Sequence, residues 1–373
     1  MKFLPLEFYI LVAPAVIFFF SWIAYDLTHG WILLSSMPPI TGKTAVTTLF
    51  GESVALYLLL FLFCYLAFKF IYSIARSPIR DAFSAHRLQK VRSAAFVFIC
   101  ILTAFVAIDF AAEMLGYNIR PERVILYGNI LAEWEYSLFG RYLFLAFPAF
   151  FSNAIVGGTL LMAYQKLLVI IGFLIVFLIL VRPAIFRKFI FSFVIAGVIS
   201  FPIWMLMPAI SPDLMFRKNY FSLEVSPAMA NELSELKMSP SLENFVDEVG
   251  EFWMGTDGKK TAVTTFPSMH VAWSLIILFY GVAAYWPLVF VLFPWALLNG
   301  LATVYTLQHY ALDVPAGIIV GLIALWITKI LVDFEKGYFT DKYKLHSLYT
   351  MTEKDSGAFI REVKATFEKI GKR

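Results

Sequence analysis

Two short histidine motifs in the last third of the chain carry the residue types best suited to chemistry. The first motif is FPSMH at 266–270, and the second is HYALD at 309–313. In the second motif a carboxylate follows a histidine by four residues, so Asp313 can accept the ring N–H of His309. That hydrogen bond fixes the tautomer and leaves the other ring nitrogen of His309 as a nucleophile or a base. We therefore take His270, His309 and Asp313 as the candidate catalytic residues.

The start of the first motif is suited to holding an anion. A helix that begins near Ser268 leaves free backbone N–H groups there, at the positive end of the helix. Pro267 fits a helix start, where its missing N–H costs nothing, and the Ser268 hydroxyl adds a donor. A phosphate between this helix end and His309 would be well held, so Ser268 is a candidate phosphate-binding residue.

The elements that carry these motifs must lie in a membrane. Hydrophobic residues make up 60% of the 373 residues, charged residues make up only 15%, and the mean hydropathy is +0.77. A soluble domain has about a quarter charged residues. A chain of this composition cannot cover itself with polar surface, so its solvent is lipid. The net charge of +4 is small, and no motif indicates nucleic-acid binding.

Apolar runs of about 20 residues predict an all-α, polytopic fold with about eight transmembrane helices. We expect these spans at 8–26, 54–75, 94–115, 155–181, 189–210, 267–285, 286–307 and 309–334. Lys166 interrupts the fourth of them. Basic residues gather in the loops 76–93 and 182–188 and in the tail after 335, which places these segments and both termini in the cytoplasm. Both termini on one side require an even number of spans, in agreement with eight.

The predicted spans bring the two motifs to the same side of the membrane. His270 begins the span 267–285 and His309 begins the span 309–334, so the 39 residues between them form one hairpin. Two crossings need about that length. We expect both histidines at one depth on the periplasmic, extracellular or lumenal side. Because polar groups in membrane helices are costly and usually functional, this match favours a site.

The chain is predicted to have three regions. They are two accessory helices and a basic cytoplasmic loop at 1–93, a six-helix catalytic core at 94–334 with an external loop at 211–266, and a basic amphipathic cytoplasmic tail at 335–373. In the external loop, apolar residues from Leu242 to Trp253 recur at helical spacing after Ser241. This pattern predicts an amphipathic helix, capped by Ser241, at the outer interface.

The two motifs resemble the signature of the type 2 phosphatidic acid phosphatase superfamily, which ends in a Pro-Ser-x-His block and a later His-x-x-x-Asp block. The resemblance covers the last third of the chain directly and implies a six-helix core from about residue 94. It implies that His309 attacks phosphorus to form a phosphohistidine and that Asp313 orients His309. His270 would protonate the leaving oxygen and then deprotonate the incoming hydroxyl. These roles agree with the chemistry of the residue types.

Two basic blocks of the superfamily's phosphatases are missing from the chain. Arg182-Pro183 has no lysine at the expected spacing, and Ala302 and Thr303 stand where the phosphatases have Ser-Arg. The sequence instead resembles the branch of inositol phosphorylceramide synthases and, more distantly, sphingomyelin synthases, which have a similar His-Tyr-x-x-Asp block. That resemblance implies transfer of a phosphorylated headgroup, of inositol-phosphate type, to the hydroxyl of a second lipid.

Neutralisation of the phosphate must then come from other bases. Arg217 and Lys218 follow the fifth span on the outer side, and Lys259 and Lys260 precede His270 by about ten residues. Either pair could reach a phosphodiester, or could instead anchor the external loop at lipid headgroups. We take all four as candidate phosphate-binding residues.

Three functions are compatible with the motifs. The first is an enzyme that transfers or hydrolyses a lipid-borne phosphate, with membrane lipids as its partners and with neither a cofactor nor a metal. The second is a two-histidine, one-carboxylate metal site, although no further carboxylates flank the motifs. The third is a transporter that uses the histidines as a proton relay, although they gather at one membrane face. We prefer the first, and transfer over hydrolysis; the sequence does not set the oligomeric state.

Overall fold

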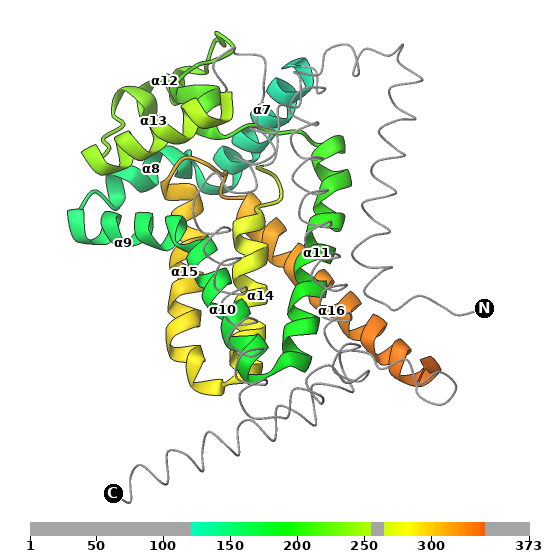
Figure 1. Ribbon diagram of the computed structural model, residues 1–373. Coiled ribbons are helices and arrows are strands. Elements are labelled where there is room, and N and C mark those ends of the chain that lie inside the picture. The colour runs from blue at the N-terminus through cyan, green and yellow to red at the C-terminus, as the bar shows by residue number, and fades with distance from the viewer. Residues whose placement is uncertain (1–120, 255–264, 340–373) are drawn as a thin grey trace, which may run out of the picture. The chain divides into compact units, whose positions relative to one another are not determined.

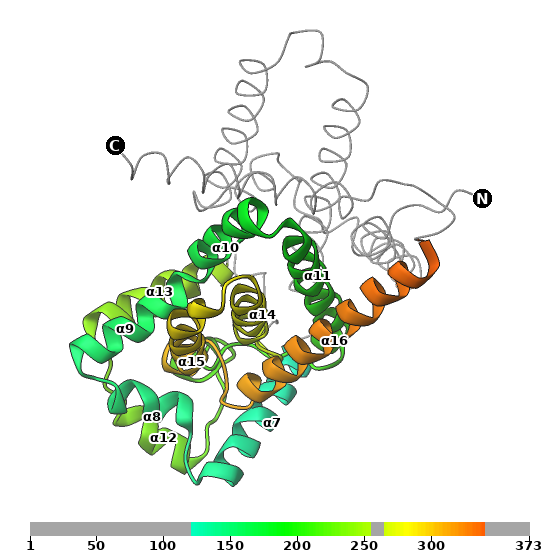
Figure 2. The same ribbon diagram turned by 90° about the horizontal axis from the view of Figure 1, so that it is seen from below.

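The computed structural model describes residues 121–254 and 265–339, and every regular element in these ranges is helical (Figure 1, Figure 2). The elements are α7 (Pro121–Phe139), α8 (Leu143–Phe150), α9 (Ala154–Gln165), α10 (Leu167–Val181), α11 (Pro183–Leu206), the π-helical turn η2 (Asp213–Arg217), α12 (Pro227–Ser234), α13 (Pro240–Met254), α14 (Met269–Ala284), the 3₁₀ turn η3 (Trp286–Leu288), α15 (Val289–Tyr305) and α16 (Asp313–Phe339). The predicted all-α class is confirmed for this part of the chain.

Several of these helices are suited to crossing a membrane. The segments Ala184–Leu206, Trp286–Tyr305 and Asp313–Phe334 are each long and apolar enough. α9 and α10 add a fourth if they form one span, interrupted by a bend near Lys166. α14 is also apolar but has only 16 residues. These helices indicate an integral membrane protein and correspond to the predicted spans between 155 and 334.

The first three predicted spans lie outside the described residues, at 8–26, 54–75 and 94–115. The count of eight therefore stays a prediction. Most of the predicted cytoplasmic tail, 335–373, also lies outside the described part of the chain.

The chain divides into two compact units. One comprises residues 1–107, 168–191 and 329–373, and the other comprises residues 108–167 and 192–328. The second, called the motif unit below, holds both histidine motifs together with α7–α9 and α12–α15. The candidate site lies wholly within the motif unit.

Within the motif unit, the first half of α16 rests directly on α14. A Cβ at Gly317 would collide with the carbonyl oxygen of Ser268, and a Cβ at Gly321 would lie 3.1 Å from the carbonyl oxygen of Ala272. Glycines four residues apart share one helix face, and small residues on such a face let two helices approach closely. Asp313 lies four residues before Gly317 on the same face, so this packing places Asp313 at the start of α14.

Short helices gather where the two motif segments lie. α14 and α15 run side by side in both views, and α8, α9, α12 and α13 lie around the end that carries 265–268 and 306–312 (Figure 1, Figure 2). α7 and α8 occur in 116–154, and η2, α12 and α13 occur in 211–266. We expected both stretches to be external loops between spans. Most of these helices are too short or too polar to be recognised as spans by hydropathy.

The predicted amphipathic helix is present as α13, but its cap differs. The Ser239 hydroxyl accepts the N–H of Leu242 at 3.3 Å, and the Ser239 carbonyl accepts the N–H of Glu243 at 3.0 Å. Ser239 therefore caps the helix, and the prediction of Ser241 was wrong, because α13 begins at Pro240, two residues before the start that a Ser241 cap would give. Leu242 is fully buried, as the amphipathic pattern predicts. Its location at the membrane interface stays a prediction.

Candidate active site

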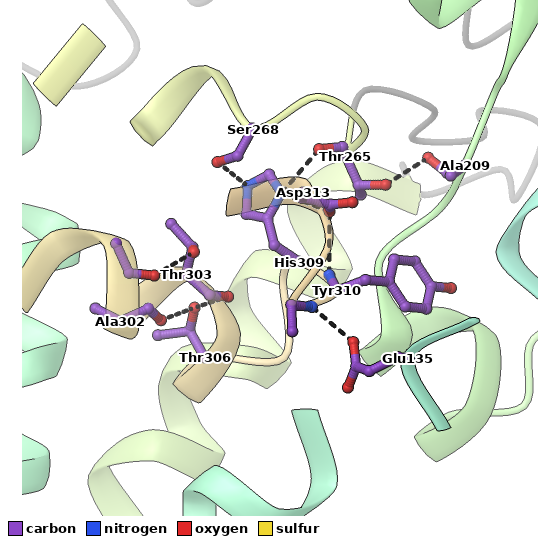
Figure 3. A network of polar contacts seen from close by, with 12 residues as sticks. Glu135, Ala209, Thr265, Ser268, Ala302, Thr303, Thr306, His309, Tyr310 and Asp313 are labelled. Atoms are coloured by element: carbon purple, nitrogen blue, oxygen red, sulfur yellow. Dashed lines mark hydrogen bonds and ion pairs between the residues drawn. The ribbon is translucent and has the colours of Figure 1, made fainter. Parts of the chain in front are cut away.

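The ring of His309 is held by two acceptors on one nitrogen. Its Nδ1 lies 3.0 Å from Oδ2 of Asp313 and 2.9 Å from the carbonyl oxygen of Thr265 (Figure 3). A carbonyl oxygen can only accept, so Nδ1 carries the proton and donates it. Nε2 therefore keeps its lone pair, and it faces the hydroxyl of Ser268 at 3.4 Å. A nucleophilic histidine needs one ring nitrogen with a free lone pair, and here that nitrogen is Nε2.

The contact between His309 and Asp313 is made by a turn, not by a helix as predicted. α15 ends at Tyr305 and α16 begins at Asp313, so His309 lies in the connection between them. The N–H of Tyr310 donates to Oδ2 of Asp313 at 3.0 Å, and the N–H of His309 donates to the Thr303 carbonyl at 3.2 Å. The Asp313 side chain closes this turn before α16 begins. The predicted contact between His309 and Asp313 is therefore present, but a turn makes it and not a helix.

His270 lies in the first turn of α14, beside His309. The centroids of the two imidazole rings are 5.8 Å apart. The backbone N–H of Ser268 donates to the carbonyl oxygen of Asp313 at 3.2 Å, which ties the start of α14 to the start of α16. Pro267 precedes the capping residue Ser268, so the expectation of Pro267 within the first helical turn was wrong. The structure brings four predicted site residues together, namely Ser268, His270, His309 and Asp313.

The first turn of α14 has polar groups that its own helix does not satisfy. The Ser268 hydroxyl makes no capping hydrogen bond to α14 and points toward His309 (Figure 3). The N–H groups of a first helical turn have no intrahelical acceptor, and they lie at the positive end of the helix. The start of α14, with Ser268, therefore stays a candidate phosphate-binding site. Of the other predicted phosphate ligands, Lys259 and Lys260 lie outside the described residues.

Arg217 and Lys218, the other predicted phosphate ligands, are paired with carboxylates. Arg217 donates to the buried Asp213 on η2 and, at 2.7 Å, to Asp247 on α13. Nζ of Lys218 lies 3.2 Å from the same Asp247 oxygen. The hydrogen bond from Arg217 lowers the pKa of Asp247, while burial opposes it. Among the described contacts, none joins either base to His309.

Tyr164 of α9 supports His270 and was missed by sequence reasoning. The two rings stack with centroids 4.3 Å apart and planes inclined by 11°. Phe245 of α13 meets the Tyr164 ring edge-on at 5.7 Å. The stack orients the imidazole, and an aromatic face attracts an imidazolium cation. Nothing in the local sequence distinguishes Tyr164 from the other tyrosines, because its partner lies 106 residues away.

Glu135 of α7 was also missed. The residue is fully buried, and its Oε2 accepts the N–H of Ala311 at 2.6 Å (Figure 3). Its Oε1 accepts the N–H of Phe144 at 3.2 Å. Burial raises the pKa of Glu135 to about 7, and the hydrogen bonds from Ala311 and Phe144 oppose that rise. Glu133, two residues earlier on the same helix, is exposed, so the sequence alone does not mark which acid matters.

The protonation state of His309 suits a nucleophile. Burial lowers the pKa of His309 to about 4, and the hydrogen bond to the Thr265 carbonyl opposes that fall. The imidazole is therefore neutral at pH 7. Asp313 is fully buried, and its Oδ1 has no hydrogen-bond partner among the described residues. Oδ2 alone therefore accepts the N–H groups of His309 and Tyr310.

The described part of the chain contains no cluster of side chains that could bind a metal ion. Within residues 121–254 and 265–339, no three side chains of His, Cys, Asp or Glu are grouped as a metal ion would require. The metal-site alternative gains no support from these residues. The expectation that the chemistry needs no metal stays a prediction.

Comparison with known families places the site in context. A family model described as the PAP2 superfamily matches residues 129–327, which is more than half of the chain and includes both histidine motifs. The chain belongs to the PAP2 superfamily. Members of this superfamily are generally phosphatases or phosphotransferases, which supports an enzyme acting on lipid phosphates. Neither the curated proteins nor the solved structures gave a significant match.

Proposed function

We propose that the protein is an integral-membrane lipid phosphotransferase that moves a phosphate or a phosphorylated headgroup between lipids through a phosphohistidine at His309. One observation carries the proposal. Nδ1–H of His309 is committed to Asp313 and Thr265, which leaves the Nε2 lone pair facing Ser268. The ring of His270 lies close enough to exchange protons with a group bound there.

The first half-reaction phosphorylates the enzyme. The Nε2 lone pair of His309 attacks phosphorus, and the bond between phosphorus and the leaving oxygen breaks. His270 donates a proton to that oxygen, so the donor lipid leaves as a neutral alcohol. Asp313 stabilises the positive charge that develops on His309 by accepting its Nδ1–H. The Asp313 carboxylate thereby keeps the proton of His309 on Nδ1 and also stabilises the transition state.

The second half-reaction regenerates the site. His270, now neutral, removes the proton of the incoming hydroxyl as its oxygen attacks phosphorus. The bond between phosphorus and Nε2 breaks, and the electron pair returns to the imidazole of His309. His270 ends protonated, ready for the next donor. A lipid hydroxyl as acceptor gives transfer, whereas water gives hydrolysis.

The phosphate's negative charge is met by several groups in this proposal. The Ser268 hydroxyl faces Nε2 of His309, and the first-turn N–H groups of α14 are further donors at the same helix start. Arg217 and Lys218 supply positive charge, with Lys259 and Lys260 as further candidates. The Asp247 side chain that bridges Arg217 and Lys218 is 48% exposed, so a phosphate oxygen can take its place there.

Transfer is favoured over hydrolysis by what replaces the phosphatases' Ser-Arg block. Ala302 and Thr303 are fully buried, and the Thr303 hydroxyl donates to the Gly300 carbonyl at 2.7 Å. These positions therefore lack the positive charge that the arginine of the phosphatases supplies. This favours a phosphodiester donor, as in the branch of inositol phosphorylceramide synthases that the sequence resembles. The alternative is a phosphatase of phosphatidate or of polyprenyl phosphates and diphosphates.

A substrate panel separates transfer from hydrolysis. The purified full-length protein would be incubated with labelled phospholipids and polyprenyl phosphates, with and without inositol-lipid and ceramide acceptors. We expect a new phosphodiester lipid that forms only when an acceptor lipid is present, and the activity should survive excess EDTA. Release of inorganic phosphate at the same rate without any acceptor lipid would instead identify the protein as a phosphatase.

A further inference from the structure

A carboxylic acid lies buried behind the turn that carries His309, and the proposed chemistry does not use it. Glu135 has 0% of its surface exposed. Among the described residues, no lysine or arginine contributes to its electrostatic surroundings, which are set by burial, backbone N–H groups and Asp313. A buried carboxylate without a cation is costly unless hydrogen bonds satisfy it. The partners of its two oxygens therefore indicate its role.

Both oxygens of Glu135 accept backbone N–H groups from other segments. Oε2 accepts from Ala311 at 2.6 Å, and Oε1 accepts from Phe144 at 3.2 Å. Ala311 is the middle residue of the turn 309–313, and Phe144 belongs to the first turn of α8. One side chain on α7 thus joins α8 to a turn whose residue Ala311 lies 176 residues after Glu135.

The turn itself closes without Glu135. The N–H of Tyr310 donates to the Asp313 carboxylate, and the N–H of Asp313 donates to the Tyr310 carbonyl, both at 3.0 Å. These two bonds set the shape of the turn but do not attach it to α7. The N–H of Ala311 instead donates to Glu135, which lies outside the turn. This bond attaches the turn to α7.

Packing around the turn agrees with an attachment to α7. The ring of Phe144 meets the Tyr310 ring edge-on, with centroids 5.6 Å apart. On α7, a Cβ at Gly128 would collide with the Met215 side chain and would lie 3.0 Å from the Tyr310 hydroxyl, so both side chains pack here against a position without a side chain. Gly128 precedes Glu135 by seven residues, or two helical turns, on the same face. That face of α7 is therefore built against the turn.

We propose that Glu135 is a positioning residue for phosphoryl transfer, which holds the Ala311 N–H and thereby sets the position of the His309 ring relative to the bound phosphate. The inference rests on the proposed function of His309. Glu135 touches no reacting atom, so its effect passes through the turn. A nucleophile misplaced by about 1 Å can lose about 10²-fold in rate.

Three variants of the full-length protein test the proposal. Glu135→Gln keeps the shape but can accept at only one atom, so either Ala311 or Phe144 loses its acceptor. Glu135→Asp keeps the charge and both oxygens, and should recover part of the function. Glu133→Gln makes the same chemical change at an exposed position on the same helix and is the matched control.

Hydrogen exchange of the turn needs no substrate. Amide exchange in a peptide that covers 306–313, followed by mass spectrometry, should be about tenfold faster in Glu135→Gln than in wild type. Glu133→Gln should match wild type. Unchanged exchange in Glu135→Gln would overturn the proposal, because the turn would then be held without Glu135.

Single-turnover release of p-nitrophenol from p-nitrophenyl phosphate tests the catalytic part. Nitrophenolate leaves without a proton, so a His270→Ala variant should lose little, while a His309→Ala variant should lose nearly all release. Like His309→Ala, Glu135→Gln should slow p-nitrophenol release even though this leaving group needs no proton. We expect the release rate per folded protein to fall by about 10²-fold. Glu135→Asp should lie between Glu135→Gln and wild type.

The outcomes separate the inference from the function on which it rests. Normal release by His309→Ala would defeat the proposed function, while the exchange result would still decide whether Glu135 holds the turn. If His309→Ala is inactive but folded Glu135→Gln has wild-type specific activity, Glu135 serves folding alone and the inference is wrong. The inference is also wrong if the Glu135→Gln defect appears only with alkyl leaving groups. Such a defect would mean that Glu135 supports the proton transfer by His270 and not the position of His309.

Discussion

At the scale of single residues, the Thr265 carbonyl gives the firmest information about how His309 is protonated. A carboxylate can accept a proton or carry one, whereas a carbonyl oxygen only accepts. The 2.9 Å contact to Thr265 therefore fixes the proton on Nδ1 and the lone pair on Nε2. The sequence motif supplied the His309–Asp313 pair, but Thr265 lies 44 residues earlier and has no signature of its own.

Asp313 should be indispensable for turnover. Asp313→Asn keeps the shape of the side chain, but an amide can present N–H groups to His309 and favour the wrong tautomer. It also removes the charge that stabilises the developing imidazolium. By analogy with the aspartate of the serine hydrolase triad, turnover should fall by about 10⁴-fold. Steady-state turnover of the lipid substrate measures this, and a variant that keeps a tenth of wild-type activity would refute the role.

Glu135 should make stability depend on pH. Its pKa is raised from 4.5 to about 7 in the folded protein, where Asp313 and Tyr310 are the titratable groups that face it. Between pH 4.5 and about pH 7, the folded state therefore binds more protons than the unfolded state. The free energy of unfolding should fall by on the order of 3 kcal/mol as pH rises from about 4.5 to about 7. Glu135→Gln should lack this part of the pH dependence.

Denaturant unfolding in detergent at several pH values measures this difference. Wild type and Glu133→Gln should show the same slope of stability against pH, and Glu135→Gln should show a shallower one. Parallel curves for all three proteins would mean that Glu135 titrates equally in the folded and unfolded states.

At the scale of elements, the glycine face of α16 positions the carboxylate of Asp313. Asp313, Gly317 and Gly321 recur every four residues, so the same face carries the Asp313 carboxylate and the contact with α14. The bond between the Ser268 N–H and the Asp313 carbonyl then fixes the register of the two helix starts. Two motifs far apart in sequence can meet because this face has no side chain at Gly317 or Gly321.

Gly317→Ala should disturb the site. The added Cβ would collide with the Ser268 carbonyl, which is backbone and cannot rotate away, so α14 must shift from α16. We expect a loss of stability and a fall in activity of at least tenfold, measured by thermal unfolding and turnover. Gly158→Ala is the control, because nothing lies within 4 Å of its Cβ. That variant should be neutral or slightly stabilised, and a neutral Gly317→Ala would disprove the close contact.

Hydropathy and periodicity predicted part of these elements. The apolar helices between 155 and 334 and the amphipathic α13 follow from composition and spacing. The helices α7 and α8 do not, because α7 carries four acidic or basic residues and α8 has only eight residues. The start of α16 was placed too early, since hydropathy runs through 306–312 without showing that Asp313 closes a turn there. Tertiary partners such as Glu135 and Tyr164 lie outside any local pattern.

At the scale of the whole molecule, the membership of the PAP2 superfamily agrees with the site that the motif unit assembles. The match spans 129–327, which includes α9–α15 and most of the elements that contact the two histidines. Spacing and depth were enough to pair the motifs, because a hairpin of two crossings has a narrow range of lengths. The side of the membrane on which the site opens rests on charge distribution alone.

Cysteine labelling tests that orientation. In a background without Cys64 and Cys100, single cysteines placed in 211–254 should react with an impermeant thiol reagent on intact cells. Cysteines placed in 76–93 should react only after permeabilisation, because five bases hold that loop in the cytoplasm. The opposite pattern would place the active site in the cytoplasm.

The central claim is that Nε2 of His309 forms a covalent bond to phosphorus, and trapping that intermediate tests it most directly. In His270→Ala, p-nitrophenolate still leaves from p-nitrophenyl phosphate, but no base remains to activate water, so the phosphoryl enzyme should accumulate. We predict a burst of about one p-nitrophenol per protein and, by mass spectrometry, one phosphoryl group on His309. A phosphoryl group on any other residue, or steady release of p-nitrophenol from an unmodified protein, would contradict the account.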